Sequence, residues 1–186
     1  MALAQWRKLS ESIVFTNPWW TYKLDRFALP SGREGEYHYV QTRGSSMIIP
    51  VEDDGTLLLV NQYRYLLGRE SLEFPCGGVK TGATHEQTAR DELAEEVGRA
   101  ATELALAGRF VPMNGVTDEM CHVYIARGLT PSTEAERDDT EEFEILRLRS
   151  DDVEARIASG EIWDGMTIAG WCLARARLDA QASAGP

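Results

Sequence analysis

Apolar and polar residues alternate along several short segments of this chain, which is the pattern of strands with one buried face. Two such segments flank a turn-forming cluster at residues 30–33, and two more flank Asp54-Gly55, a dipeptide that favours a tight hairpin turn. We therefore expect two antiparallel strand pairs early in the chain. The expected strands are residues 19–29, 35–42, 46–51, 56–62, 72–74, 104–113, 120–126 and 143–148.

Helical patterns occur once in the middle of the chain and twice near its end. In the segment 84–97, Ala89, Leu93 and Val97 fall on one arc and give the helix a face to bury. Gly98 follows it as a typical helix C-cap residue. The other expected helices are residues 151–159 and 166–178. Strands broken by a central helix and followed by further helices predict an α+β fold, a mixed-sheet sandwich between helical layers.

The first 45 residues carry many aromatic residues but are too few to bury them in a core of their own. We expect a small N-terminal antiparallel strand appendage over residues 1–45 and a main domain over residues 46–186. The apolar side of the appendage comprises Trp19, Tyr22, Phe27, Tyr37 and Tyr39. Composition leaves open whether this side packs on its own domain or on a second copy of the chain.

Composition and charge narrow the classes of partner. The net charge of −11 argues against binding to nucleic acid or to an anionic membrane surface, because both are bound through clusters of Lys and Arg. No stretch approaches 18 consecutive apolar residues, and there is no secretion-like leader. The three cysteines lack CxxC spacing, which indicates reduced thiols. We therefore expect a cytoplasmic protein without a membrane or nucleic-acid partner.

The main candidate for chemistry is a glycine-rich run at residues 76–83, which leads into the central helix. In that helix Glu92 and Glu96 lie one above the other, and Glu95 lies about 60° to one side. Three carboxylates in one stripe repel each other unless a cation neutralises them, and hard divalent ions take oxygen ligands. The alternative is an acidic face exposed to water, which the helix alone leaves open.

These residues resemble the box of the Nudix hydrolases, which reads Gly-x5-Glu-x7-Arg-Glu-U-x-Glu-Glu-x-Gly-U with U apolar. Three positions depart from it, since Ala83 replaces Glu, Asp91 replaces Arg and Arg99 replaces an apolar residue. In the family the missing Glu and Arg form an ion pair that ties loop to helix. Removing both members of a pair costs less than removing one. The matching positions are Gly77, Glu92, Leu93, Glu95, Glu96 and Gly98.

We expect Glu86 and Arg90, four positions apart on the helix, to supply a substitute tether of about 0.3–0.5 kcal/mol. The resemblance continues from about residue 17 to 178 and is strongest to the ADP-ribose pyrophosphatase branch. It is carried by the segments 25–27, 35–37, 57–65, 72–75, 115–119 and 160–167.

This branch implies metal-dependent hydrolysis of the diphosphate bond in a nucleoside diphosphate linked to a sugar, such as ADP-ribose. The products are a nucleoside monophosphate and a sugar phosphate, and the cofactor is Mg²⁺ or Mn²⁺ with two or more ions per site. The branch also implies a homodimer that exchanges its N-terminal segments. The alternative function is a catalytically weak Nudix domain that binds a nucleotide as a sensor.

The resemblance also implies roles for single residues. The metal ligands are Glu92, Glu95, Glu96 and the backbone carbonyl of Cys76. The general base comes from a mobile acidic loop, where Glu141 and Glu142 are the candidates, and Glu95 acts in catalysis as well. The candidate substrate-binding residues are Phe27, Glu36, Arg64, Glu73, Asn114, Gly115 and Glu119.

Several of these residues have a plain structural alternative. Aromatic residues at alternating positions, such as Phe27, are usually part of a core, and Arg64 could simply pair with Glu73. Asn114 stands where members dedicated to ADP-ribose typically carry Pro, and its amide adds hydrogen-bonding capacity. We therefore expect other nucleotide sugars to compete with ADP-ribose.

Overall fold

The computed structural model describes residues 3–132 and 144–183 of the chain. Within them the three expected helices and the α+β class are confirmed. The elements in chain order are β1 (Arg7–Thr16), β2 (Thr21–Ala28), β3 (Glu34–Gln41), β4 (Ser45–Pro50), β5 (Leu57–Arg64), the 3-10 turn η1 (Tyr65–Leu67), β6 (Arg69–Glu73), β7 (Cys76–Gly78), α1 (His85–Val97), β8 (Arg99–Phe110), β9 (Cys121–Pro131), β10 (Glu144–Leu148), α2 (Ser150–Ser159) and α3 (Gly165–Ser183).

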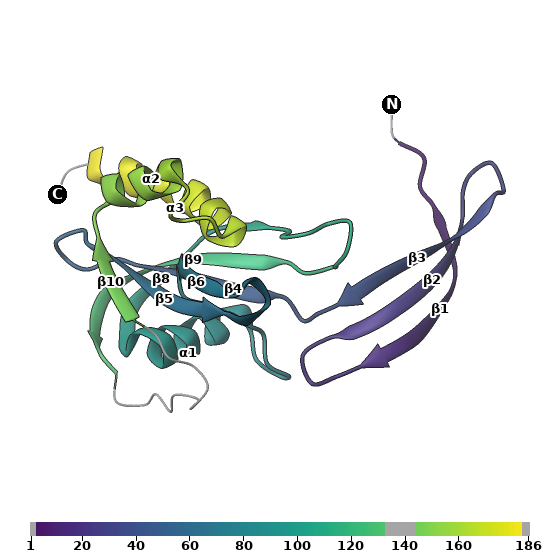
Figure 1. Cartoon of the computed structure of the whole chain (residues 1–186), viewed down its shortest axis with the longest axis horizontal. Coiled ribbons are helices and arrows are strands. Elements are labelled where there is room, and N and C mark those ends of the chain that lie inside the picture. Colours follow the sequence, from purple (N-terminus) through teal and green to yellow (C-terminus); the bar gives the residue numbers. More distant parts are fainter. Residues whose placement is uncertain (1–2, 133–143, 184–186) are drawn as a thin grey trace.

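The body of the molecule is a sandwich with helices on both sides of its sheets (Figure 1). One sheet has the order β7-β4-β9-β8 and the other β10-β5-β6. Strand β4 runs parallel to β9, whereas its pairing with β7 is antiparallel, so the four-stranded sheet is mixed. Helix α1 lies on one side, and α2 and α3 lie together on the other.

Two hydrophobic clusters fill the spaces between these layers. The predicted apolar face of α1 is buried, since Ala89 and Leu93 are fully inaccessible and Val97 nearly so. They pack against Ile48 of β4 and Leu58 of β5. Burying a side chain such as Leu93 stabilises the fold by roughly 1.5–3 kcal/mol, so this face fixes α1 to the sheet.

The expected strand pair across Asp54-Gly55 is only partly correct. The turn forms, with Gly55 at φ 82° and its amide donating to Glu52 O at 2.8 Å. The strands on either side then diverge into different sheets and are joined by a single bridge between Val51 and Leu57. Strand β4 is buried along its whole length, so it takes partners on both edges, β7 and β9, in place of β5.

The N-terminal segment forms a separate three-stranded sheet of order β1-β2-β3 (Figure 1). The predicted β2–β3 hairpin is confirmed, whereas β1 was not expected. Two register shifts interrupt the β1–β2 pairing, and such bulges break the alternation by which a strand is recognised. The sheet meets the body at few points, among them the Thr42 amide, which donates to Asp118 Oδ1 at 2.9 Å.

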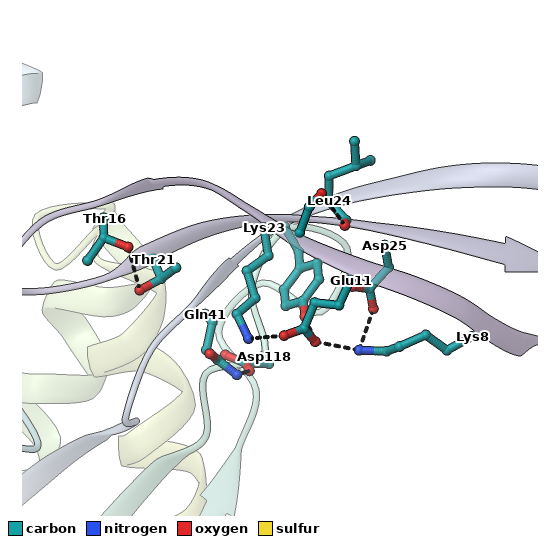
Figure 2. A network of polar contacts seen from close by, with 11 residues as sticks. Lys8, Glu11, Thr16, Thr21, Lys23, Leu24, Asp25, Gln41 and Asp118 are labelled. Carbon is teal, nitrogen blue, oxygen red and sulfur yellow. Dashed lines mark hydrogen bonds and ion pairs between the residues drawn. The ribbon is translucent and has the colours of Figure 1, made fainter.

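A charged network crosses the three strands of this sheet (Figure 2). Glu11 of β1 accepts hydrogen bonds from Lys23 of β2 and from Lys8, each at 2.6 Å, and Lys8 also pairs with Asp25 at 2.8 Å. Tyr39 of β3 donates its hydroxyl to Glu11 Oε2 at 3.5 Å. The hydrogen bonds from Lys23 and Lys8 lower the pKa of Glu11 to about 2. The network therefore links all the strands of a sheet that has little core.

Within the described residues, no helix combines the length and apolar character needed to cross a bilayer.

Candidate active site

A cavity of about 940 Å³ opens between the body and the turn that joins β1 to β2. Its wall includes the three predicted ligand carboxylates, Glu92, Glu95 and Glu96, together with Cys76 and Gly77 of the preceding loop. The fold therefore brings together the loop and the helix that the sequence analysis singled out.

Local sequence explains how loop and helix are held. Strand β7 pairs with β4, so that Gly77 lies opposite Ser46. Helix α1 begins after Thr84, whose Oγ1 accepts a hydrogen bond from the Gln87 amide at 3.1 Å, an N-cap contact. It ends at Gly98, which has φ 68° and the left-handed conformation that glycine adopts without strain.

The contact between Gly77 and Glu92 is unusually close. A Cβ atom placed at Gly77 would lie 1.9 Å from Oε1 of Glu92, so a side chain cannot be accommodated without moving this carboxylate. The absence of a side chain at position 77 thus lets the carboxylate lie directly against the loop backbone. A carboxylate beside backbone carbonyls is a donor set suited to a hard divalent cation.

The three carboxylates differ in their surroundings. Glu92 and Glu96 are buried, with 8% and 5% exposure, which is costly for a charged group that lacks compensation. Glu95 is partly exposed and pairs with Lys80, whose Nζ lies 3.1 Å from Oε1. Within the described residues, no three His, Cys, Asp or Glu side chains are arranged to hold a metal ion. The donor chemistry fits a divalent cation, but Glu95 is engaged by Lys80.

Cys76 lies close to this acidic stripe. Its hydrogen bond with Cys121, its burial and the nearby charges of Glu96 and Glu92 raise the pKa of the Cys76 thiol well above its usual value. A thiol that stays protonated is a poor nucleophile. Its side chain is therefore unsuited to covalent catalysis.

Arg64 and Glu73 both line the cavity and are each other's partners, as the structural alternative anticipated. Arg64 Nε donates to Glu73 Oε1 at 2.8 Å, and Nη2 contacts Oε2. This hydrogen bonding raises the pKa of Arg64. Glu119 also lines the cavity and accepts a hydrogen bond from Ser45 Oγ at 2.6 Å.

Four predicted substrate-binding residues lie away from this cavity in the described chain. Phe27 stacks on Trp6 with ring centroids 4.4 Å apart, as expected for a structural aromatic residue. Glu36 is exposed on β3 of the same sheet. Asn114 and Gly115 are exposed in the loop between β8 and β9, where the Gly115 carbonyl accepts a hydrogen bond from Tyr37 at 3.3 Å. The candidate bases Glu141 and Glu142 lie outside the described residues.

The expected tether between Glu86 and Arg90 forms, at 3.0 Å, but it does not connect loop to helix. Both residues belong to α1, and Arg90 Nη1 donates to the Ala101 carbonyl of β8 at 3.1 Å. The pair therefore fastens α1 to the sheet. A contact that does connect loop to helix is the ion pair between Lys80 and Glu95.

Sequence reasoning missed several residues of the cavity wall. Trp19 and Trp20 reach it from the β1–β2 turn, where their amides donate to Asn17 Oδ1 at 2.9 and 2.8 Å. The Asn17-Pro18 dipeptide is a signal for the turn itself, but it does not indicate that the turn reaches the cavity. Arg43 joins the turn to the glycine-rich loop by donating to Pro18 O at 3.2 Å and Val79 O at 2.9 Å.

Comparison with known proteins agrees with this geometry. A family model described as the NUDIX domain matches residues 41–163. The chain is 32% identical over 140 residues to an ADP-ribose pyrophosphatase of Bacillus subtilis, covering 75% of this chain and 76% of that protein. It is 30% identical over 173 residues to an ADP-ribose pyrophosphatase of Mycobacterium tuberculosis, covering 91% and 83%. A crystal structure of an ADP compounds hydrolase shares the fold, with a TM-score of 0.85 at 21% identity over 97% of this chain and 98% of that one.

Proposed function

The chain belongs to the NUDIX family, and on this basis we propose that it hydrolyses the diphosphate bond of ADP-ribose or a related nucleotide sugar. The products are a nucleoside monophosphate and a sugar phosphate. The observation that carries the proposal is the meeting of Glu92, Glu95 and Glu96 with the Gly77 loop in one cavity of about 940 Å³. Pockets of this size are typical of small-molecule sites.

Nudix hydrolases generally use divalent metal ions, and this cavity offers suitable donors. Glu92, Glu96 and the backbone carbonyl of Cys76 would hold Mg²⁺ or Mn²⁺, with Glu95 serving a second ion or a water molecule. Such ions, when bound, polarise phosphoryl oxygens and lower the pKa of the attacking water.

Residues of this chain would also bind the substrate and supply the general base. Arg64, fixed in orientation by Glu73, would donate to an oxygen of the diphosphate or the ribose, as planar guanidinium groups do well. Trp19 and Trp20 offer aromatic faces at the mouth of the cavity for the base. A general base is also required, and we keep Glu141 or Glu142 in this role, with Glu119 as the described carboxylate that could replace them.

We further propose that the protein is a homodimer in which residues 1–45 act as the pairing segment. The N-terminal sheet exposes Ile13, Val14 and Phe15, and the body exposes Tyr65 and Leu66, the latter at 92%. Exposed large apolar side chains of this kind support burial against a second copy of the chain. Phe27, Glu36 and the Asn114 loop would then act through a site completed by the second copy. The match of the family model from residue 41 supports a boundary near residue 45.

A panel of nucleotide sugars with Mg²⁺ or Mn²⁺ tests the proposal through the monophosphate released. Turnover of ADP-ribose or a relative supports it, whereas no turnover of any member contradicts it. The engagement of Glu95 by Lys80 favours one alternative, a Nudix domain that binds its nucleotide without efficient hydrolysis. Calorimetric binding of a nucleotide sugar without released monophosphate would support that alternative.

A further inference from the structure

Lys80 holds a position at the cavity wall that the family resemblance does not explain. Its Nζ lies 3.1 Å from Oε1 and 3.4 Å from Oε2 of Glu95, so it contacts both oxygens of one carboxylate. This contact raises the pKa of Lys80, with further contributions from Glu92 and Asp91. The ammonium group therefore lies within the field of Glu92 as well as that of Glu95.

The backbone on both sides of Lys80 is anchored. The Val79 amide donates to Gly44 O at 2.9 Å, and the Val79 carbonyl accepts from Arg43 Nε at 2.9 Å. On the other side, the Ala83 amide donates to the carbonyl of Lys80 itself at 3.1 Å. Because the loop is held in this way, the side chain extends from a fixed point toward Glu95.

The local sequence also leaves to Lys80 the role of linking the glycine-rich loop to α1. Ala83 has no charge, and Asp91 accepts a hydrogen bond from Gln87 on the same helix at 2.8 Å. Neither residue can bind loop to helix through opposite charges. The ion pair of Lys80 with Glu95 spans that gap, over 15 positions of sequence.

We propose that Lys80 is a resident counter-cation: it neutralises Glu95 in the metal-free protein and gives up this contact when a divalent cation binds. The proposal rests on the proposed function, because it takes the acidic stripe as the metal site. While Lys80 pairs with Glu95, this carboxylate of the stripe is engaged by a cation that belongs to the chain itself. Metal occupancy then depends on competition between a tethered cation and a free one.

The positive charge of Lys80 should have opposite effects on metal binding and on the thermal stability of the metal-free protein. A positive charge beside a ligand repels an incoming divalent cation, so its removal should strengthen metal binding by about threefold to tenfold. The same charge relieves repulsion among the carboxylates before metal arrives, so its removal should lower the thermal stability of the metal-free protein. If Lys80 served only as a structural tether, its removal would instead weaken metal binding.

The test measures Mn²⁺ binding to the full-length protein by titration, with free Mn²⁺ read from its electron paramagnetic resonance signal. The variants are Lys80→Met, Lys80→Arg and Arg90→Met, the last removing the same charge from a residue that pairs with Glu86. We expect Lys80→Met to lower the Kd for Mn²⁺ about threefold to tenfold and to lower the melting temperature in chelator. Lys80→Arg and Arg90→Met should keep the Kd within about twofold.

An unchanged or raised Kd in Lys80→Met, with wild type binding Mn²⁺ normally, overturns the role of Lys80 and leaves the proposed function standing. Failure of the wild type to bind Mn²⁺ at all contradicts the metal site, and with it both proposals. Equal shifts in Lys80→Met and Arg90→Met would show only the effect of net charge, and would also overturn the specific role.

Discussion

Arg64 of β5 and Glu73 of β6 lie on adjacent strands, offset by four positions in register, and join at two points, with Nε donating to Oε1 at 2.8 Å and Nη2 contacting Oε2. Glu73 is 4% exposed, whereas the Arg64 side chain is 43% exposed. The buried carboxylate thus depends on a cation that also faces the cavity. The pair therefore contributes to the fold and also lines the cavity of the proposed function.

A double-mutant cycle with Arg64→Met and Glu73→Gln should give a coupling energy of roughly 0.5–3 kcal/mol in urea unfolding. Arg64→Met should be the more damaging single change, because it leaves the buried carboxylate without its cation. It should also raise KM more than it lowers kcat. A coupling energy near zero would show that the pair contributes nothing to stability.

Glu92→Gln and Glu96→Gln should each lower turnover by about two orders of magnitude or more, since an amide cannot neutralise a bound cation. Without metal, each should melt at the wild-type temperature or above, because a like-charged pair four positions apart costs about 0.2–0.5 kcal/mol. Steady-state kinetics and calorimetry in chelator measure the two effects. Glu86→Gln, on the exposed side of the same helix, is the matched control. Near wild-type turnover of both variants in saturating Mg²⁺ would refute the metal assignment.

The stability of the N-terminal sheet should depend on pH through the ionisation of Glu11. Its pKa is lowered from 4.5 to about 2 by Lys23 and Lys8, so its contribution is complete above pH about 4.5 and is lost as the pH falls toward 2. In urea unfolding followed by tryptophan fluorescence, Glu11→Gln should be less stable than wild type at pH 6, and the difference should shrink below pH 4.5. Glu34→Gln, in an exposed pair with Arg26, is the control. A difference that stays constant from pH 6 to pH 2 would contradict the prediction.

Removal of residues 1–42 should abolish both the dimer and nucleotide binding. The deletion removes Trp19, Trp20 and the contacts that Val40 and Thr42 make with the loop between β8 and β9. Light scattering should give the full-length protein about twice its 20.8 kDa mass, and the truncated protein its monomer mass. A truncated monomer that still hydrolyses substrate would rule out the exchanged segment.

Substrate choice should respond to Asn114. If its amide hydrogen-bonds a sugar hydroxyl in the assembled site, Asn114→Pro should shift the ratio of kcat/KM values for ADP-ribose, ADP-glucose and GDP-mannose toward ADP-ribose. Proline offers no donor and fixes φ. An ADP-ribose preference above about 100-fold, equivalent to about 2.7 kcal/mol, that the substitution leaves unchanged would argue against this role.

Local signals in the sequence predicted the parts of the fold that local contacts determine. The helix over residues 84–97 had a cap, an apolar arc and a terminal glycine, and it forms as expected. The turn at Asp54-Gly55 also forms, but the turn does not specify which partners the strands take farther out. The partners of β4 follow from its burial on all sides. This burial depends on β7 and β9, which come later in the chain.

The same distinction between local and distant contacts applies to the candidate site. Spacing alone placed Glu92 and Glu96 together, because a helix repeats every 3.6 residues. The pairing of Lys80 with Glu95 depends on the path of a loop, and the approach of Trp19 depends on how a separate sheet is docked. Neither relationship has a fixed spacing along the chain, so no pattern in the sequence could reveal it.

The parallel pairing of β4 with β9 has a consequence for the time course of folding. It places Ser45 beside Cys121, and the hydrogen bond from Ser45 to Glu119 joins residues 74 positions apart. Closing so long a loop costs chain entropy before any contact compensates for it, which slows folding. The glycine-rich loop pairs with the same strand β4, so its final position beside α1 depends on this distant contact. A nascent chain that ends before β9 therefore carries all the box residues without an assembled cavity.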